Sequence, residues 1–211
     1  MPSPNASGGP VLQVLASGFQ LWIRQQCQSV ESLEIQLDGS ALGLLRGRLA
    51  GVQLLARKAV YRHLPIEQVQ LSSEAIALQM GNLLKGQTLQ LDQPFAISGQ
   101  LSFTAVGLKA LLTHPQWQWL AHELQDHLLG QLPLLKVSFA QGGLVMQTRG
   151  AGPGDAIDLP IQIGASGGTI VLSGPSGQPL YRLPMDPNIS IEQAWVEAGM
   201  LQLRGRARVS P

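Results

Sequence analysis

The run Gly164-Ala165-Ser166-Gly167-Gly168 matches the Gly-x-Ser-x-Gly pattern in which many hydrolases present a nucleophilic serine. That chemistry requires a strand, a sharp turn and a helix, with the histidine base later in the chain. Here a strand pattern continues through Thr169–Leu172, and all 4 histidines precede Ser166. The sequence therefore predicts a hairpin loop at this position, and we assign no catalytic residue to the chain.

A second cluster, His122-Glu123-Leu124-Gln125-Asp126-His127, approaches the His-Glu-x-x-His motif of zinc proteases. Two histidines four residues apart would reach one metal ion from the same helix face. Asp126 occupies the second of these positions, and His127 lies one step further around the helix. His122 and Asp126 are opposite the apolar stripe of the segment, so we expect a solvated face, with no metal site and no cofactor.

The segment between Gly39 and Ile66 has an unusual distribution of charge, because it contains basic residues but no acidic one. The basic residues are Arg46, Arg48, Arg57, Lys58 and Arg62. Such groups bind lipid phosphates, and each contributes about 1 kcal/mol at an anionic surface. Strand alternation separates Arg57 from Lys58 and Arg62. The candidate headgroup residues are therefore Arg46, Arg48, Lys58 and Arg62.

Three leucines, Leu42, Leu44 and Leu45, precede the first two arginines of this segment. If these leucines insert into a bilayer, Arg46 and Arg48 lie at headgroup depth with their stems along apolar surface. The alternative is that the leucines cover a sheet and the arginines are solvated.

Composition limits the class of protein. A length of 211 residues suggests one domain, and 45% apolar with 13% charged residues allows a sizeable core. A net charge of +1 and 5% aromatic residues argue against a nucleic-acid partner. The lone Cys27 cannot form an internal disulfide.

The N-terminal segment divides into two parts. Residues Met1–Pro10 have no periodicity and indicate a disordered lead, before a single domain over residues 11–211. Val11–Val30 has the spacing of an amphipathic helix, which packs on the domain or lies on a bilayer. Its first basic residue, Arg24, follows the apolar stretch, so we expect no signal peptide and no membrane-spanning helix.

The remaining pattern predicts an α+β fold. Apolar and polar residues alternate from Leu33 to Phe103 and again from Leu135 to Val209, which indicates half-buried antiparallel strands. Between them, Thr104 caps one predicted helix, Pro115 begins a second, and Gly130 ends it.

The run Gly39-Ser40-Ala41-Leu42-Gly43-Leu44-Leu45-Arg46-Gly47-Arg48-Leu49-Ala50-Gly51-Val52-Gln53-Leu54-Leu55-Ala56, with Leu83-Leu84-Lys85-Gly86, resembles the LmeA-like phospholipid-binding family. The continuation Pro94–Thr104 is similar to its cyanobacterial branch, and the resemblance covers roughly Val30 to Gly150. The resemblance implies a non-enzymatic protein that binds anionic phospholipids. It also implies a tubular lipid-binding fold, in which a curved antiparallel sheet wraps around a helix pair and an apolar groove.

These observations together predict a peripheral lipid-binding protein, with lipid transfer or maintenance of a membrane or envelope as the roles considered. Acyl chains would occupy an apolar concave face while the basic residues meet phosphate. Envelope members of the family carry an export signal or anchor, which this sequence does not show, so the expected location is the cytoplasmic face of a membrane. The alternative is a scaffold or assembly factor whose exposed apolar face binds a protein partner.

Overall fold

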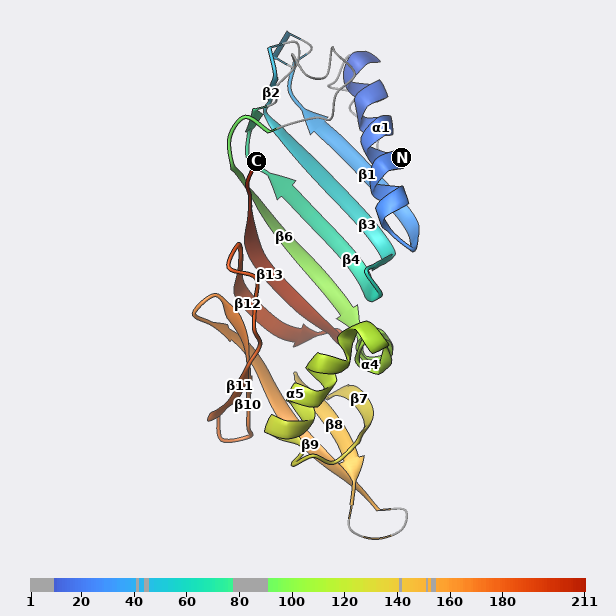
Figure 1. Ribbon diagram of the computed structural model, residues 1–211, viewed down its shortest axis with the longest axis vertical. Coiled ribbons are helices and arrows are strands. Elements are labelled where there is room, and N and C mark those ends of the chain that lie inside the picture. Colours follow the sequence, from blue (N-terminus) through green and yellow to red (C-terminus); the bar gives the residue numbers. More distant parts are fainter. Residues whose placement is uncertain are drawn as a thin grey trace.

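A computed structural model describes residues 10–40, 42–43, 46–77, 91–140, 142–150, 152 and 155–211. Within these residues the chain forms a 6-stranded sheet, a 5-stranded sheet and a 2-stranded ladder, with helices beside the two larger sheets (Figure 1). All strand pairs are antiparallel, which confirms the predicted α+β class with curved antiparallel sheets. The predicted disordered lead before Pro10 and the run Leu83–Gly86 lie outside the described residues.

The 6-stranded sheet forms the upper half of the molecule in Figure 1. Its strands, in spatial order, are β1 (Ser29–Asp38), β3 (Gly51–Tyr61), β4 (Leu64–Ser73), β6 (Phe95–Thr104), β13 (Met200–Val209) and β12 (Ile189–Glu197). The ladder of β2 (Arg48–Leu49) and β5 (Ile76–Ala77) lies at its upper end. Because β13 pairs with β6 over its whole length, the last strand of the chain lies beside a strand from its middle.

The two faces of this sheet differ in polarity. In β1, Leu33, Ile35 and Leu37 are buried while Glu34 and Gln36 between them are exposed, as period-two alternation requires. Helix α1 (Pro10–Gln26) packs on the apolar face, where it contributes Leu12, Leu15, Ala16, Phe19 and Ile23 to the core. The amphipathic helix is thus confirmed, although it ends at Gln26 and not at Val30. The amide of Gln28 donates to the carbonyl of Val60 at 2.9 Å, so the chain has already joined the sheet.

The lower half contains the 5-stranded sheet and the other helices. Its strands are β7 (Leu134–Ala140), β8 (Gly143–Arg149), β9 (Ala156–Ser166), β10 (Thr169–Ser173) and β11 (Pro179–Arg182). The helices are α4 (Ala105–Thr113), the 3-10 turn η1 (Pro115–Trp117) and α5 (Gln118–Leu128). The predicted cap is present, because Oγ1 of Thr104 accepts from the amide of Gly107 at 3.0 Å.

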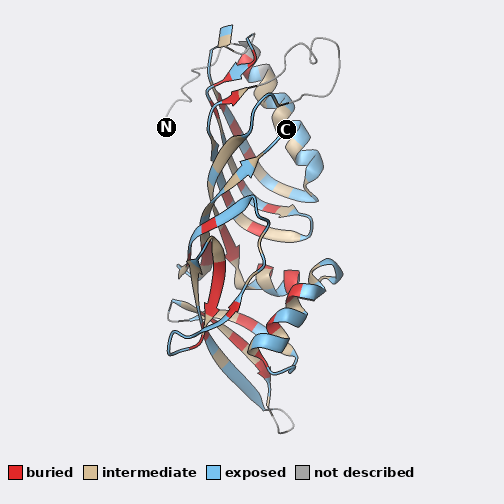
Figure 2. Ribbon diagram, turned by 60° about the vertical axis from the view of Figure 1, so that its left-hand side comes forward, coloured by how far each residue is buried: buried red, intermediate tan, exposed pale blue. Residues whose placement is uncertain are grey.

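Buried apolar residues form two clusters, one under α1 and one between the helices and strands of the lower half (Figure 2). In the lower cluster, Leu120 and Leu124 of α5 are buried, as the apolar stripe predicted. The residues that contact both clusters are Leu64, Leu108, Phe139, Ile163 and Leu203. The apolar interior is therefore continuous between the upper and lower halves of the molecule.

Candidate functional site

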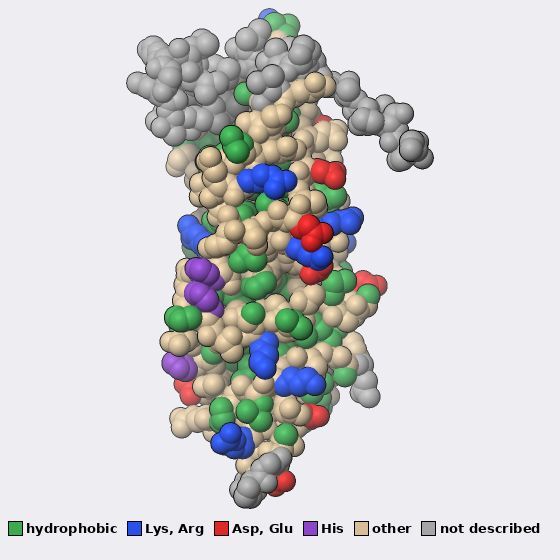
Figure 3. All heavy atoms as spheres, turned by 90° about the vertical axis from the view of Figure 1, so that its right-hand side faces the viewer, with side chains coloured by type: hydrophobic (Ala, Val, Ile, Leu, Met, Phe, Trp, Pro, Cys, Tyr) green, Lys and Arg blue, Asp and Glu red, His purple; other side chains and the backbone are tan. Residues whose placement is uncertain are grey.

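The basic residues selected from the sequence form two separate groups. Arg46 and Arg48 lie at the upper end of the sheet, next to the start of β3, whereas Lys58 and Arg62 lie at the end of that strand. Lys58 is seven residues from the start of β3 and Arg62 follows its end, so the groups are separated by roughly 23 to 33 Å at about 3.3 Å per residue. On the face shown in Figure 3, basic side chains are likewise spread along the body and not gathered in one patch. One lipid headgroup cannot contact all four residues.

The arginines at the upper end line a surface pocket. Arg46, Arg48, Leu49 and Ile76 contribute to a hollow of about 580 Å³ beside the β2–β5 ladder. Gly47 between the arginines has a φ of 72°, a conformation that favours glycine, and it turns the chain between them. Neither guanidinium group is held in an ion pair with a described residue, and the acidic residue Asp92 also lines this hollow.

The leucines expected to insert into a bilayer are only partly described. Leu42 has 58% of its surface exposed and lies on the segment that leads to Arg46. The amide of Arg46 donates to the carbonyls of Leu42 at 3.2 Å and Gly43 at 3.0 Å, so the segment turns tightly here. Leu44 and Leu45 lie outside the described residues. The exposed Leu42 beside two arginines has the polarity of a membrane-contacting tip.

The second basic group is engaged within the protein. Nζ of Lys58 lies 2.9 Å from the carboxylate of Glu31. The hydrogen bond and charge of Glu31, with a smaller contribution from Glu67, raise the pKa of Lys58 above its usual value. Arg62 lies in the turn between β3 and β4, with its guanidinium carbon 5.4 Å from the ring centroid of Tyr61. Lys58 therefore stays charged and has Glu31 as a partner in an exposed ion pair.

The turn between β3 and β4 also contacts the helices of the lower half. Its two residues, Arg62 and His63, have φ values of 48° and 61°. Nε1 of Trp117 donates to the carbonyl of Arg62 at 3.1 Å, and the ring of His63 stacks on His114 with centroids 4.0 Å apart. The sequence analysis missed this contact, because the two segments are 50 residues or more apart and carry no local pattern that links them.

The other residues considered for chemistry lie in ordinary structural settings. Ser166 is the last residue of β9 and pairs with Thr169 across a turn formed by Gly167 and Gly168. Both glycines have positive φ, 64° and 79°, which is typical of a two-residue hairpin and confirms the predicted hairpin. His122 and Asp126 are both exposed on α5, which confirms the solvated face.

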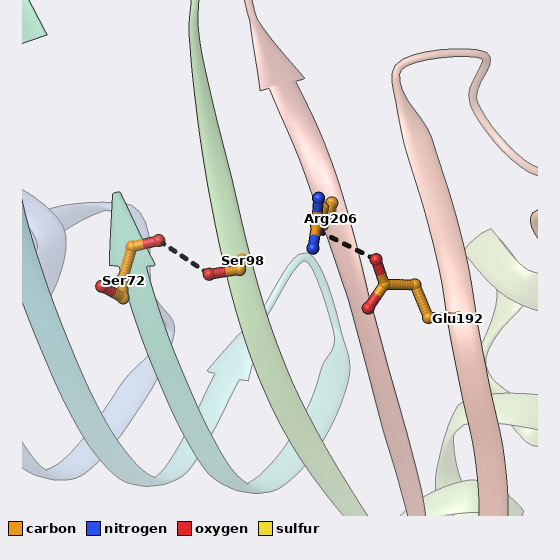
Figure 4. Close-up of polar contacts among 4 residues, drawn as sticks. All are labelled: Ser72, Ser98, Glu192 and Arg206. Carbon is orange, nitrogen blue, oxygen red and sulfur yellow. Dashed lines mark hydrogen bonds and ion pairs between the residues drawn. The ribbon is translucent and has the colours of Figure 1, made fainter. Parts of the chain in front are cut away.

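A groove of about 750 Å³ crosses the sheet on the face opposite α1. The side chains that face it are mainly glutamine and serine, together with Leu55 and the charged residues Glu34, Glu192, Arg204 and Arg206. Figure 4 shows Ser72, Ser98, Arg206 and Glu192 projecting from four successive strands. The hollowed face is therefore polar, which corrects the expectation of an apolar concave face.

The apolar side chains lie on the α1 face and are incompletely covered. The half-buried members contributed there by strands of the upper sheet include Val52, Leu54, Leu71, Leu101 and Leu203. In the lower half, apolar residues of α4, α5 and the sheet enclose a cavity of about 80 Å³. Small-molecule sites usually measure about 300–1,000 Å³, so this apolar cavity is smaller than they are. The α1 face is the apolar surface open to further packing.

An elongated α+β protein with curved sheets, one apolar face under a helix and two exposed arginines at one end has the features of a lipid-binding protein. This chain belongs to the LmeA-like phospholipid-binding family, whose model matches residues 7–206. The match extends well beyond the segment in which the sequence motifs were found. No curated protein and no solved structure matches the chain. None of the helices in the described residues has the length and apolar character needed to cross a bilayer.

Proposed function

We propose that this protein is a non-enzymatic, peripheral membrane protein that binds anionic phospholipids. Membership of a phospholipid-binding family supports lipid as the ligand. The observation that carries the proposal is the position of two arginines, neither in an ion pair with a described residue, at one end of an incompletely covered apolar face. An amphiphile has the same polarity, because its charged head adjoins its apolar chains.

The acyl chains pack along the α1 face in this proposal. Leu54, Leu71 and Leu101 are half-buried there, and α1 covers the edge of the sheet nearest β1. Each methylene group buried against these residues contributes about 0.8 kcal/mol, so burial of several methylene groups of one acyl chain would hold a lipid. Small outward displacement of α1 would widen this site, because the helix contacts mainly β1.

The phosphate lies at Arg46 and Arg48. Arginine presents a planar fork of donors that matches phosphate oxygens, and both arginines are exposed. Leu42 beside them contacts the bilayer, which favours a peripheral location on a membrane surface. Lys58 is held by Glu31, so we assign Lys58 and Arg62 no more than a secondary contact with the membrane.

Co-sedimentation with vesicles tests this function. We expect binding to vesicles that contain phosphatidylglycerol and weaker binding to phosphatidylcholine alone. Binding should decline as salt rises from about 0.05 to 0.5 M, since the Debye length shortens over that range. Equal binding to both vesicles would contradict the headgroup role of the arginines, and no binding to either would contradict the function.

Extraction of the purified protein separates lipid binding from the scaffold alternative. Co-purified phospholipid, identified by mass spectrometry, would support the proposal. A stoichiometric polypeptide with no lipid would favour a scaffold that binds through exposed apolar residues such as Trp22, which has 57% of its surface exposed.

A further inference from the structure

The polar groove on the open face of the upper sheet has no role in phospholipid binding as proposed above. Consecutive residues of a strand point to opposite faces, so Gln70 faces the groove while Leu71 faces the α1 side. A lipid whose chains lie on the α1 face would have to cross the sheet to place its headgroup in the groove. Any ligand of the groove is therefore a separate molecule.

Most of the uncharged side chains that face the groove both donate and accept hydrogen bonds, and one of them, Leu55, is apolar. The side chains that donate and accept are Gln36, Gln53, Gln70, Ser72, Ser98 and Gln100. Four charged residues also line it, but Glu34 and Glu192 balance Arg204 and Arg206. Nε of Arg206 lies 2.9 Å from the carboxylate of Glu192, which neutralises that arginine further (Figure 4). The groove favours a polar ligand without net charge.

Internal hydrogen bonds hold the sides of the groove in place. Nε2 of Gln53 donates to Asp38 at 2.9 Å, and Gln100 accepts from Nη2 of Arg204 at 3.2 Å. Between these fixed groups, the amide of Gln70 makes no hydrogen bond to a described side chain or backbone group. It therefore offers two donors and an acceptor at the centre of the sheet.

A half-buried aromatic ring, that of Trp195, lies next to the groove on the same face of the sheet. Trp195 is opposite Gln202 in the register of β12 and β13, and it is half-buried on this face. The guanidinium carbon of Arg204, which lines the groove, lies 5.8 Å from the ring centroid of Trp195, and the ring lines a neighbouring hollow with Glu192. Flat aromatic rings pack on the C–H faces of sugar rings, while amides bind the surrounding hydroxyls.

We propose that this groove binds a short, uncharged oligosaccharide. Its volume of about 750 Å³ is in the usual range for small-molecule sites, and its lining matches vicinal hydroxyls, each of which donates and accepts. The site is independent of the proposed phospholipid site, because the two lie on opposite faces of one sheet.

Isothermal titration of the full chain with neutral oligosaccharides of glucose, galactose, mannose and N-acetylglucosamine tests the proposal. At least one should bind with a Kd below about 1 mM, and inorganic phosphate should not compete. Gln70→Leu should weaken that binding about 10-fold, because it removes two or more neutral hydrogen bonds. Ser72→Ala should weaken it less. Gln118→Leu, at an exposed glutamine of α5, is the matched control and should change nothing.

The proposal is overturned if no oligosaccharide binds at about 10 mM, or if binding is the same in the wild type and Gln70→Leu. Competition by phosphate would show an anion site instead. Binding of Gln70→Leu to anionic vesicles should equal that of the wild type, so failure of the sugar site and failure of the phospholipid proposal give different results. Circular dichroism confirms folding, and Ser72→Ala serves as the second test if Gln70→Leu does not fold.

Discussion

Charge reversal at the upper end of the sheet is the sharpest test of the phospholipid site. Arg46 and Arg48 are exposed, line the same pocket and take part in no ion pair with a described residue. The double variant Arg46→Glu/Arg48→Glu therefore breaks no ion pair that stabilises the fold. Exposed substitutions of this kind usually change the free energy of unfolding by less than about 0.5 kcal/mol.

The expected loss of binding follows from the charges. Each reversal removes one attractive charge and adds one repulsive charge, and each charge contributes about 1 kcal/mol near an anionic surface. The expected loss of binding free energy is about 2 to 4 kcal/mol, and the lower value allows for screening by salt. It corresponds to roughly 30- to 1,000-fold weaker binding at low salt.

The assay compares thermal midpoint and vesicle binding for the wild type, Arg46→Glu/Arg48→Glu and the control Lys109→Glu/Lys136→Glu. The control has the same net charge, and its two lysines are exposed in the lower half of the molecule. We expect both variants to melt as the wild type does and only the arginine variant to lose binding. Equal loss in both would show that net charge alone matters. Normal binding by the arginine variant would refute the assignment, and early melting would show that the arginines are structural.

Three further predictions concern stability. Thr104→Ala removes the cap on the amide of Gly107 and should lower the free energy of unfolding by about 1 kcal/mol in a urea titration; no loss would show that the cap contributes nothing. Tyr181→Phe removes a buried hydroxyl that lies near the Glu123 carboxylate but makes no hydrogen bond of ordinary geometry to a described residue, so the thermal midpoint should change little. Burial and the nearby carboxylate raise the pKa of Tyr181 above its usual value, so the folded state resists its ionisation and stability falls as pH rises above about 10. The phenylalanine variant should lose less stability there, and an equal loss would contradict this cause. Gly205→Ala places a methyl group against a carbonyl oxygen of the adjacent strand and should lower the free energy of unfolding by about 1–3 kcal/mol. The control Gly164→Ala meets nothing within 4 Å and should not lower it. Equal thermal midpoints for the two variants would refute the packing argument.

The amino-acid sequence by itself determined the local structure and the family. Period-two alternation identified the half-buried strands, because one face of each strand must be apolar to pack. Thr104 and Gly130 marked helix ends, since the cap and the left-handed turn depend on nearest neighbours in the chain. The run of residues 39–56, which is rich in leucine and glycine, resembled one family. The family model matches residues 7–206 and shows the same family.

Tertiary structure alone decided which residues share a site. Arg48 and Arg62 are close in sequence, yet a whole extended strand separates them, because a strand advances about 3.3 Å for each residue. The groove joins Gln36 to Arg206 and the turn at His63 stacks on His114, although nothing in the local pattern links them. Sheet order is set by long-range pairing and by packing of the apolar faces. The neighbours of a residue on an adjacent strand therefore cannot be read from its own segment.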